Sequence, residues 1–274
     1  MSTGLYAVQH VRRMRGGSQS HLMRASDGHF YVVKFQNNPQ HLRVLANEMF
    51  ATRLGQWLGL PMPRVEVIEV SDWLITNSPD MRVDVGGLGK PCSSGPQLAS
   101  LYPDLTTQVF DYLPEGLLTQ IKNLGDYARC VVLDKWTGNC DGRQAIFTRK
   151  PRARKFTAIF IDQGYCFNAG EWTFPDSPLR GVYARNCVYQ DVTGWEAFEP
   201  ALSKAEEADI TDIWRCAESI PPEWYGYDHD ALNQMVETLH QRRSIIRNLI
   251  NAFRQSSRNP FPNWPVSSSF VQNI

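Results

Sequence analysis

Two charged side chains stand among apolar neighbours in the first fifty residues. Lys34 lies in a run of β-branched and aromatic residues, 30–35, which predicts a strand. Glu48 lies on a predicted helix, and its neighbours three and four positions away are Val44, Leu45, Ala51 and Thr52. An unpaired buried charge is costly, so each needs an opposite partner. A strand lysine followed 14 residues later by a helix glutamate can form an ion pair that holds nucleotide phosphates; the alternative is two ordinary surface residues.

Two aspartates follow later, each at the edge of a predicted strand. Asp141 lies in a glycine-flanked turn, where a carboxylate can accept a proton from an attacking hydroxyl. Asp162 emerges 21 residues later from the apolar strand 156–161 and can act as a Mg²⁺ ligand. The amides of Asn139 and Gln144 are candidates to bind metal or to orient the base. The alternative for both aspartates is a turn residue that caps its own backbone.

The loop of small residues between the first two predicted strands is a candidate phosphate-binding site. It contains Gly16, Gly17, Ser18, Gln19 and Ser20. Such residues let backbone N–H groups approach phosphate oxygens. The loop matches neither G-x-x-x-x-G-K-[ST] nor G-x-G-x-x-G, so a plain β-hairpin stays an alternative.

The elements that position these residues fall into two regions. Strands are predicted at 5–11, 22–25, 30–35 and 64–70, and a helix at 42–58 that ends at Gly59. Further helices are predicted at 126–136, 204–218 and 230–253, around a hairpin with strands at 145–148 and 156–161. The Gly, Ser and Pro content of 83–103 indicates a connection. We therefore expect an N-terminal lobe (1–82), a connection (83–103), a C-terminal lobe (104–258) and a surface tail (259–274).

Composition narrows the class of protein. The 274 residues carry 28 basic and 28 acidic side chains, so there is no strong nucleic-acid signal. No apolar run approaches the roughly 18 residues of a membrane-spanning segment, and the N-terminus does not resemble a signal peptide. The six cysteines lack zinc-site spacing and are predicted to be reduced thiols. These features predict a soluble cytoplasmic protein.

Five segments resemble successive motifs of one family. They are GGSQS at 16–20, YVVKF at 31–35, NEMFATRLGQWLGLP at 47–61, GNCDG at 138–142 and IDQG at 161–164. Together they resemble the HipA-like kinases, bacterial relatives of the phosphatidylinositol-kinase branch of the protein-kinase-like fold. The resemblance covers about residues 5 to 170. Because it begins so close to the first residue, we expect a minimal version without the extra N-terminal subdomain of longer relatives.

The resemblance implies a fold and a reaction. The fold would be α+β and bilobal, with an N-terminal β-sheet lobe carrying one helix and a mainly helical C-terminal lobe. The cofactors would be ATP and Mg²⁺, and the reaction transfer of the γ-phosphate to a hydroxyl, preferably a protein serine or threonine. A pseudokinase that binds nucleotide or partners, and a lipid kinase, stay open as alternatives. An inhibitory or regulatory partner protein is also possible.

The resemblance also implies roles for single residues. Lys34 would hold the ATP phosphates together with the loop 16–20, and Glu48 would orient Lys34. Asp141 would be the catalytic base and Asp162 the Mg²⁺ ligand. The family usually has an asparagine five residues after the base, where this sequence has Ile146, so a second metal ligand would have to be Gln144 or Asn139.

One feature lies outside these roles. Residues 149–155 carry five basic side chains in seven positions at the tip of the predicted hairpin. A solvated tip is the default interpretation. The alternative is a docking patch for an acidic substrate, an anionic membrane surface or RNA phosphates.

Overall fold

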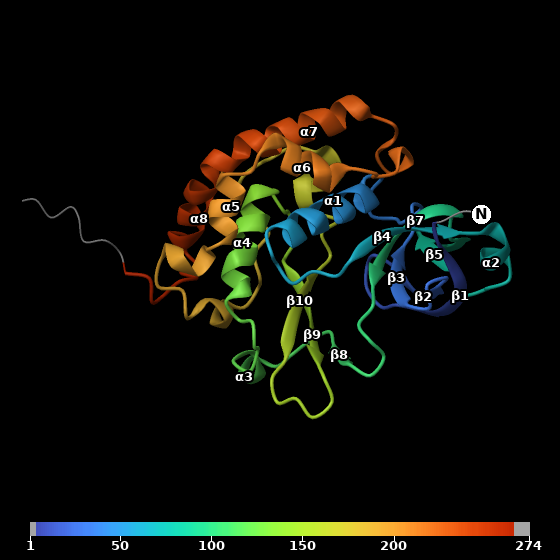
Figure 1. Ribbon diagram of the computed structural model, residues 1–274, viewed down its shortest axis with the longest axis horizontal. Coiled ribbons are helices and arrows are strands. Elements are labelled where there is room, and N and C mark those ends of the chain that lie inside the picture. Colours follow the sequence, from blue (N-terminus) through green and yellow to red (C-terminus); the bar gives the residue numbers. More distant parts are fainter. Residues whose placement is uncertain (1–3, 266–274) are drawn as a thin grey trace, which may run out of the picture.

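The computed structural model describes residues 4–265, which form a small barrel beside a larger, mainly helical region (Figure 1). The barrel contains β1 (Leu5–Arg13), β2 (His21–Ala25), β3 (Phe30–Lys34), β7 (Gly95–Leu101) and β4 (Val65–Val70), in that order. Parallel pairing of β1 with β4 closes it. Alternate side chains such as Met23, Tyr31 and Val33 point inward and form its core. The predicted α+β arrangement is confirmed.

The segment 83–103 is not the simple connection that its composition indicated. It contains most of β5 (Arg82–Val85), all of β6 (Leu88–Pro91) and all of β7. β5 and β6 form a hairpin, while β7 pairs with both β3 and β4 inside the barrel. The glycines that suggested a linker lie at turns with positive φ, namely Gly86, Gly87 and Gly95, so the composition marked strand boundaries.

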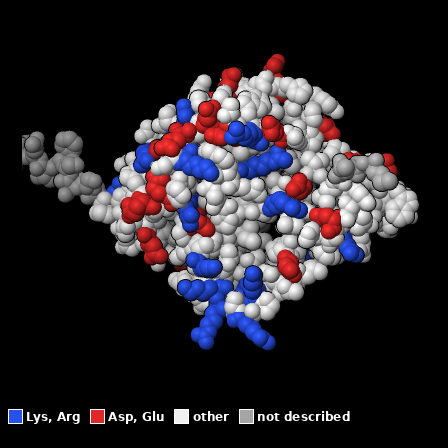
Figure 2. Space-filling view, in the orientation of Figure 1, with Lys and Arg blue, Asp and Glu red and all other residues white. Residues whose placement is uncertain are grey.

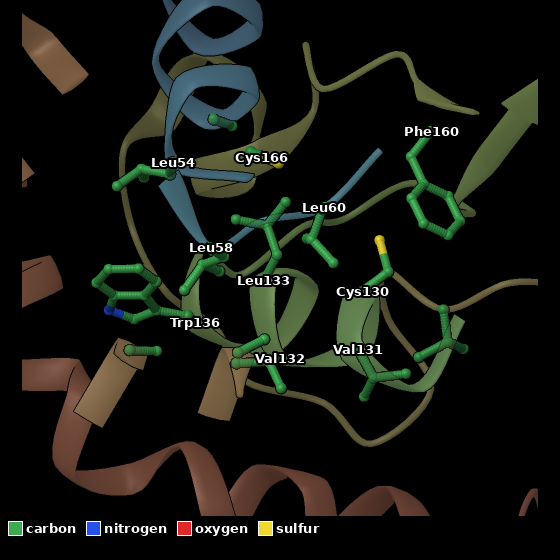
Figure 3. Packing of buried hydrophobic residues seen from close by; sticks show 14 of the residues in the cluster. Leu54, Leu58, Leu60, Cys130, Val131, Val132, Leu133, Trp136, Phe160 and Cys166 are labelled. Atoms are coloured by element: carbon green, nitrogen blue, oxygen red, sulfur yellow. The ribbon is translucent and has the colours of Figure 1, made fainter. Parts of the chain in front are cut away.

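The helix α1 (Val44–Trp57) lies between the barrel and the helical region. Leu54 and, just after the helix, Leu58 pack against Leu133 and Trp136 of α4 (Asp126–Trp136), as Figure 3 shows. The buried face of α1 therefore belongs to the larger core, although the sequence placed this helix in the N-terminal lobe.

A second sheet lies below the helices in Figure 1 and has the order β10–β9–β8. Its strands are β8 (Gln108–Phe110), β9 (Gln144–Arg149) and β10 (Thr157–Ile161). β9 and β10 form the predicted hairpin, with bounds within one residue of those expected. The pair of Ile161 with Gln144 closes its inner end.

The remaining elements are mostly short helices. The α-helices are α2 (Asp72–Thr76), α3 (Glu115–Leu118), α5 (Ala201–Glu206), α6 (Ile210–Ala217), α7 (His229–Arg242) and α8 (Ile246–Arg254). The 3₁₀ helices are Cys166–Glu171, Asn186–Tyr189, Trp195–Phe198, Pro222–Tyr225 and Arg243–Ile245. The helix predicted at 204–218 is divided because Asp209 caps a new helix, α6. The one predicted at 230–253 is divided by the last 3₁₀ turn.

The predicted surface tail is wrong for the part that the structure describes. Phe261 and Trp264 are 2% and 9% exposed and belong to the larger core. Trp264 packs edge-on against Trp195, with ring centroids 5.0 Å apart, and both residues contact Phe198. Aromatic side chains here are buried without a helix or strand, so no periodicity revealed them. Residues 266–274 of the predicted tail lie outside the described residues.

Candidate active site

Lys34 lies at the centre of a buried ion-pair cluster. It is the last residue of β3 and is 7% exposed. Its Nζ donates to Oε2 of Glu48 on α1 and to Oδ1 of Asp162 after β10, each at 2.8 Å. The structure therefore brings together three residues that the sequence selected from positions up to 128 apart.

The ion pairs keep Lys34 charged although it is buried. Burial lowers the pKa of Lys34, but the carboxylates of Glu48 and Asp162 outweigh this effect, and the net pKa lies above its ordinary value. The charge of Lys34 is the main reason why the pKa of Asp162 is lowered. The ammonium of Lys34 and the carboxylate of Asp162 are therefore both ionised at neutral pH, and the pair can contact an oxyanion and a cation.

Asp162 is held in an unusual backbone conformation. Its φ of 63° lies in the left-handed region, which non-glycine residues adopt mostly at strained or functional positions. Gln144, the first residue of β9, donates its Nε2 to Oδ2 of Asp162 at 3.0 Å. Of the two candidate second ligands, the structure thus brings Gln144 next to Asp162. Ile146 lies two positions further along β9, on the same face as Gln144.

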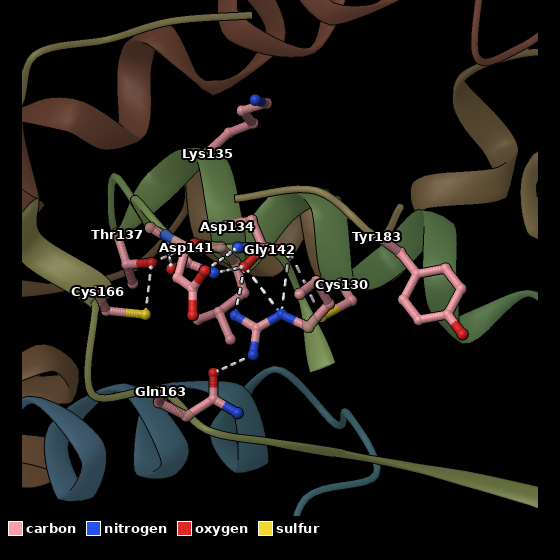
Figure 4. Close-up of polar contacts among 12 residues, drawn as sticks. Cys130, Asp134, Lys135, Thr137, Asp141, Gly142, Gln163, Cys166 and Tyr183 are labelled. Atoms are coloured by element: carbon pink, nitrogen blue, oxygen red, sulfur yellow. Dashed lines mark hydrogen bonds and ion pairs between the residues drawn. The ribbon is translucent and has the colours of Figure 1, made fainter. Parts of the chain in front are cut away.

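A buried polar network holds the turn that carries Asp141 (Figure 4). Asp134 on α4 forms an ion pair with Arg143, and the side chains of both are 1% exposed. Arg143 also donates to Oε1 of Gln163, the residue after Asp162. Asn139 donates to Oδ1 of Asp134 at 2.9 Å and accepts from the backbone N–H of Asp141 at 3.2 Å. The amide of Asn139 is therefore used to shape the turn and does not reach Asp162.

Asp141 itself is exposed. Its Oδ1 accepts from the backbone N–H of Gly142 at 2.7 Å. Tyr165 lies near both aspartates: burial raises the pKa of this phenol, and the charges of Asp141 and Asp162 raise it further. Asp141 and Asp162 thus both lie close enough to Tyr165 for their charges to act on its phenol.

A single amide connects α1 to the segment after Asp162. Nδ2 of Asn47 donates to the carbonyls of Gly164, Cys166 and Ala169 at 3.0, 2.9 and 2.7 Å. Its Oδ1 accepts from the indole N–H of Trp172 at 2.7 Å. Asn47 is completely buried. It fixes the chain after Asp162 to the helix that carries Glu48.

The loop 16–20 is held at both sides. Gly16 has a φ of 117°, which favours glycine, and accepts from the backbone N–H of Gln19. The side chain of Gln19 donates to the carbonyl of Asp84 at 2.9 Å, and the carbonyl of Ser18 accepts from Asn38 at 2.7 Å. Gly16 and Gly17 are exposed, whereas Ser20 is buried. The tip of the loop therefore presents backbone to solvent from a fixed base.

The residues around Asp162 suit a hard divalent cation that is also held by phosphates. Between residues 4 and 265, no three His, Cys, Asp or Glu side chains are arranged to hold a metal by themselves. Mg²⁺, however, is usually held by one or two carboxylates together with substrate phosphates and water. An ionised Asp162 supplies one such carboxylate, and Gln144 donates a hydrogen bond to it.

Arg143, Asp134 and Asn47 were not selected from the sequence. Asp134 lies within the apolar helix 126–136, and Asn47 precedes Glu48 among apolar neighbours. For Asp134 and Asn47, the signal in the sequence was a polar residue within an apolar helical stretch. For Arg143 there was no signal in the sequence, since an arginine after a turn is common on protein surfaces.

Comparisons with solved structures show a kinase fold. Hydra Fam20 with sugar gives a TM-score of 0.57 at 11% identity, covering 98% of this chain and 90% of its own. The Golgi casein kinase with Mn/ADP bound gives 0.52 at 12% identity, covering 93% and 74%. The HipA chain of the Shewanella oneidensis HipA, HipB and operator DNA complex gives 0.50 at 10% identity, covering 90% and 68%. The protein therefore has a kinase-like fold.

The family follows from a different comparison. The model of the HipA-like kinase family matches residues 8–151, and the chain belongs to this family. A search of curated proteins gave no significant match. Family and fold together support phosphoryl transfer of the kinase type. No helix within residues 4–265 has the length and apolar character needed to cross a bilayer.

Proposed function

We propose that the protein transfers the γ-phosphate of Mg·ATP to a serine or threonine hydroxyl of a protein. The observation that carries this proposal is the buried bridge of Lys34 to both Glu48 and Asp162, at 2.8 Å each. Phosphoryl transfer depends mainly on positioning and on neutralising phosphate charge, and this bridge supplies fixed charges of both signs.

Lys34 contacts the phosphates of ATP in this proposal. Glu48 keeps the ammonium in place, and the exposed backbone N–H groups of Gly16 and Gly17 would bind phosphate oxygens. Asp162, with Gln144 beside it, would hold the metal. Bound Mg²⁺ would neutralise charge on the phosphate oxygens. The related fold of the Golgi casein kinase was solved with Mn/ADP, which supports nucleotide and divalent metal use here.

Asp141 acts as the base. Its carboxylate is exposed and held through the backbone by Asn139, so an acceptor hydroxyl can approach it. Removing the proton from this hydroxyl during attack on the γ-phosphate contributes typically 10²–10⁴-fold to a rate.

The second candidate is a pseudokinase, and Ile146 favours it. This side chain cannot bind metal, and Gln144 presents its amide nitrogen to Asp162. If the second metal is essential, the protein would bind nucleotide without transferring phosphate.

The test is incubation with labelled ATP and Mg²⁺, followed by mass spectrometry of the products. Asp141→Asn is expected to keep Mg·ATP affinity in calorimetry and to lose transfer by roughly 10²–10⁴-fold. The exposed Asp191→Asn is the matched control and should change neither. Wild-type protein that binds nucleotide but phosphorylates neither itself, nor protein extract, nor lipid would establish the pseudokinase. Phosphorylation of lipid alone would establish the lipid kinase.

A regulatory partner belongs to the same proposal. The Shewanella HipA chain, which shares the fold, was solved together with HipB and operator DNA. We propose that this chain also has an inhibitory or regulatory partner protein. Copurification from the native cells with tagged protein, followed by mass spectrometry, would identify it.

A further inference from the structure

The tip of the β9–β10 hairpin concentrates positive charge. Residues 149–155 hold five of the 28 basic side chains, and the rest of the sequence has five more acidic than basic residues. Figure 2 shows these side chains gathered at the lower end of the molecule, where the hairpin projects in Figure 1. We call Lys150, Arg152, Arg154 and Lys155 the basic tip.

The four cations of the basic tip are available for a partner. All are exposed, and none forms an ion pair within the described part of the chain. Arg149 differs, because its guanidinium stacks over the rings of Phe110 and Phe156 and donates to Gln108. Arg149 thus fixes the base of the tip to the sheet, while the tip cations remain unpaired.

The inner end of the same hairpin is the candidate active site. β9 begins at Gln144, and Asp162 follows the last residue of β10. The five residues of β10 span about 17 Å at about 3.3 Å per residue. A protein segment bound at the tip and an acceptor hydroxyl at Asp141 would therefore be separated by at least about five extended residues.

The chemistry of the tip favours a carboxylate-rich partner. Between the four cations it has only Pro151 and Ala153, so it offers no aromatic ring on which a base could stack and no large apolar side chain to enter a bilayer. Arginine forks pair well with carboxylates. The rest of the sequence has an acidic excess, which would repel a polyanion that extends well beyond the tip, such as a long RNA or an anionic membrane, more than a short acidic segment.

We propose that the basic tip docks an acidic, extended segment of the protein substrate and so raises the local concentration of the acceptor at Asp141. This inference rests on the proposed function. Its binding test uses no nucleotide, so docking and catalysis can fail separately.

Binding is measured by fluorescence polarisation with two labelled peptides. Both carry serines and threonines, then a seven-residue Gly/Ser spacer, then either six glutamates or six glutamines. Wild-type protein is expected to bind the glutamate peptide at least tenfold more tightly at low salt, with the difference shrinking as salt increases. Equal affinity for the two peptides would overturn the proposal.

Two charge-matched variants locate the site. Arg154→Glu with Lys155→Glu should abolish most of the difference between the peptides. Arg24→Glu with Lys90→Glu makes the same change in net charge at exposed positions on β2 and β6, and should preserve at least half of it. An equal loss in both variants would show a general charge effect and contradict docking at the tip.

Alternative ligands are tested in the same assay. A 20-residue uridine RNA or phosphatidylserine vesicles that bind more tightly than the glutamate peptide, in a tip-dependent way, would also overturn the proposal.

Turnover then connects docking to the substrate. With labelled ATP, the glutamate peptide should show a lower KM than the glutamine peptide at similar kcat, and the tip variant should remove this difference. Equal KM values for wild-type protein would contradict substrate docking. Tip-dependent binding without any phosphate incorporation would contradict the proposed function while supporting the acidic docking surface.

Discussion

At the scale of single residues, the cluster around Lys34 makes the charges interdependent. Lys34 lies between two carboxylates, and the side chains of Lys34 and Glu48 are 9% and 4% exposed. Removing Lys34 leaves two carboxylates unpaired, and removing either carboxylate leaves Lys34 with a single partner; both changes are costly in a buried site. In the proposed function, activity and local stability therefore depend on the same three side chains.

Lys34→Ala is expected to weaken Mg·ATP binding at least tenfold and to reduce turnover by two orders of magnitude or more, because the ammonium is the fixed positive charge of the site. Glu48→Gln should give a milder loss, since the lysine remains. Calorimetry and labelled-ATP assays check both, with circular dichroism to show that the fold survives. The exposed Lys90→Ala is the control. Unchanged ATP affinity in Lys34→Ala would refute the assignment.

The two candidate metal contacts should differ in effect. Asp162→Ala is expected to abolish the Mg²⁺ dependence of nucleotide binding, because it removes the ionised oxygen donor. Gln144→Ala should cause only a partial loss that higher Mg²⁺ concentrations restore. Titration of nucleotide affinity against Mg²⁺ measures both. A Gln144→Ala protein with a wild-type Mg²⁺ curve would exclude this amide from the site.

Charged residues among apolar neighbours could be recognised from the sequence. Lys34 and Glu48 among apolar neighbours called for opposite charges, and the structure pairs them. The role of Asn139 could not be predicted from the sequence. Its amide forms hydrogen bonds with Asp134 and with the backbone of Asp141. Those directions depend on how the turn packs on α4, which a one-dimensional pattern does not contain.

At the scale of elements, α1 is anchored to the helical region and to the chain after Asp162. Its apolar face belongs to the larger core, and Asn47 holds three carbonyls beyond Asp162. A helix held in this way cannot move with the barrel alone. Glu48 and Asp162 therefore keep their relation to each other even if the barrel shifts.

Asn47→Ala tests this anchoring. Losing the amide leaves three carbonyls and one indole N–H without their partner, so we expect a destabilisation of about 2–4 kcal/mol by urea unfolding. In the folded fraction, kcat should fall about tenfold while KM for ATP changes less, because Lys34 and the loop 16–20 are untouched. Gln56→Ala, which removes an exposed amide from the other end of α1, is the matched control. Equal kinetic effects of both variants would contradict a positioning role.

The barrel should lose stability in mild acid through His21. Burial, and then His10 at 3.0 Å, lower the pKa of His21 from 6.5 to about 4. Between these values the unfolded chain binds a proton that the folded chain does not, so stability is complete above pH 6.5 and falls as pH decreases toward 4. After solvent screening we expect about 1–2 kcal/mol of loss between pH 7 and 5. Urea unfolding should show less pH dependence in His21→Gln, whereas the exposed His29→Gln should behave as wild type.

Element types were predictable where periodicity was strong, as in α4 and the β9–β10 hairpin. β7 was missed because it lies in a segment rich in Gly and Pro, and its place between β3 and β4 depends on pairing across more than sixty residues. Local composition carries no information about such a partner.

At the scale of the whole molecule, the larger core extends almost to the end of the described chain. Trp264 is buried against Trp195, Phe198 and Phe261. Trp264→Ala should therefore cost about 3 kcal/mol and lower Tm by roughly 6–12 °C. Trp73→Ala, at a tryptophan that is 71% exposed, should cost less than about 0.5 kcal/mol. Equal Tm values for the two variants would show that this end contributes nothing to the fold.

Because β9 and β10 pair antiparallel, the length of the hairpin can change by two residues per strand without changing which face each side chain points to. Because side chains alternate faces, adding two residues to each strand would extend the outer end by about 7 Å and leave Gln144 and Asp162 facing each other. Adding one residue to β10 alone would turn Asp162 to the opposite face or force a bulge. The reach of this hairpin can therefore be changed by two residues per strand without altering the arrangement of Gln144 and Asp162 at its inner end.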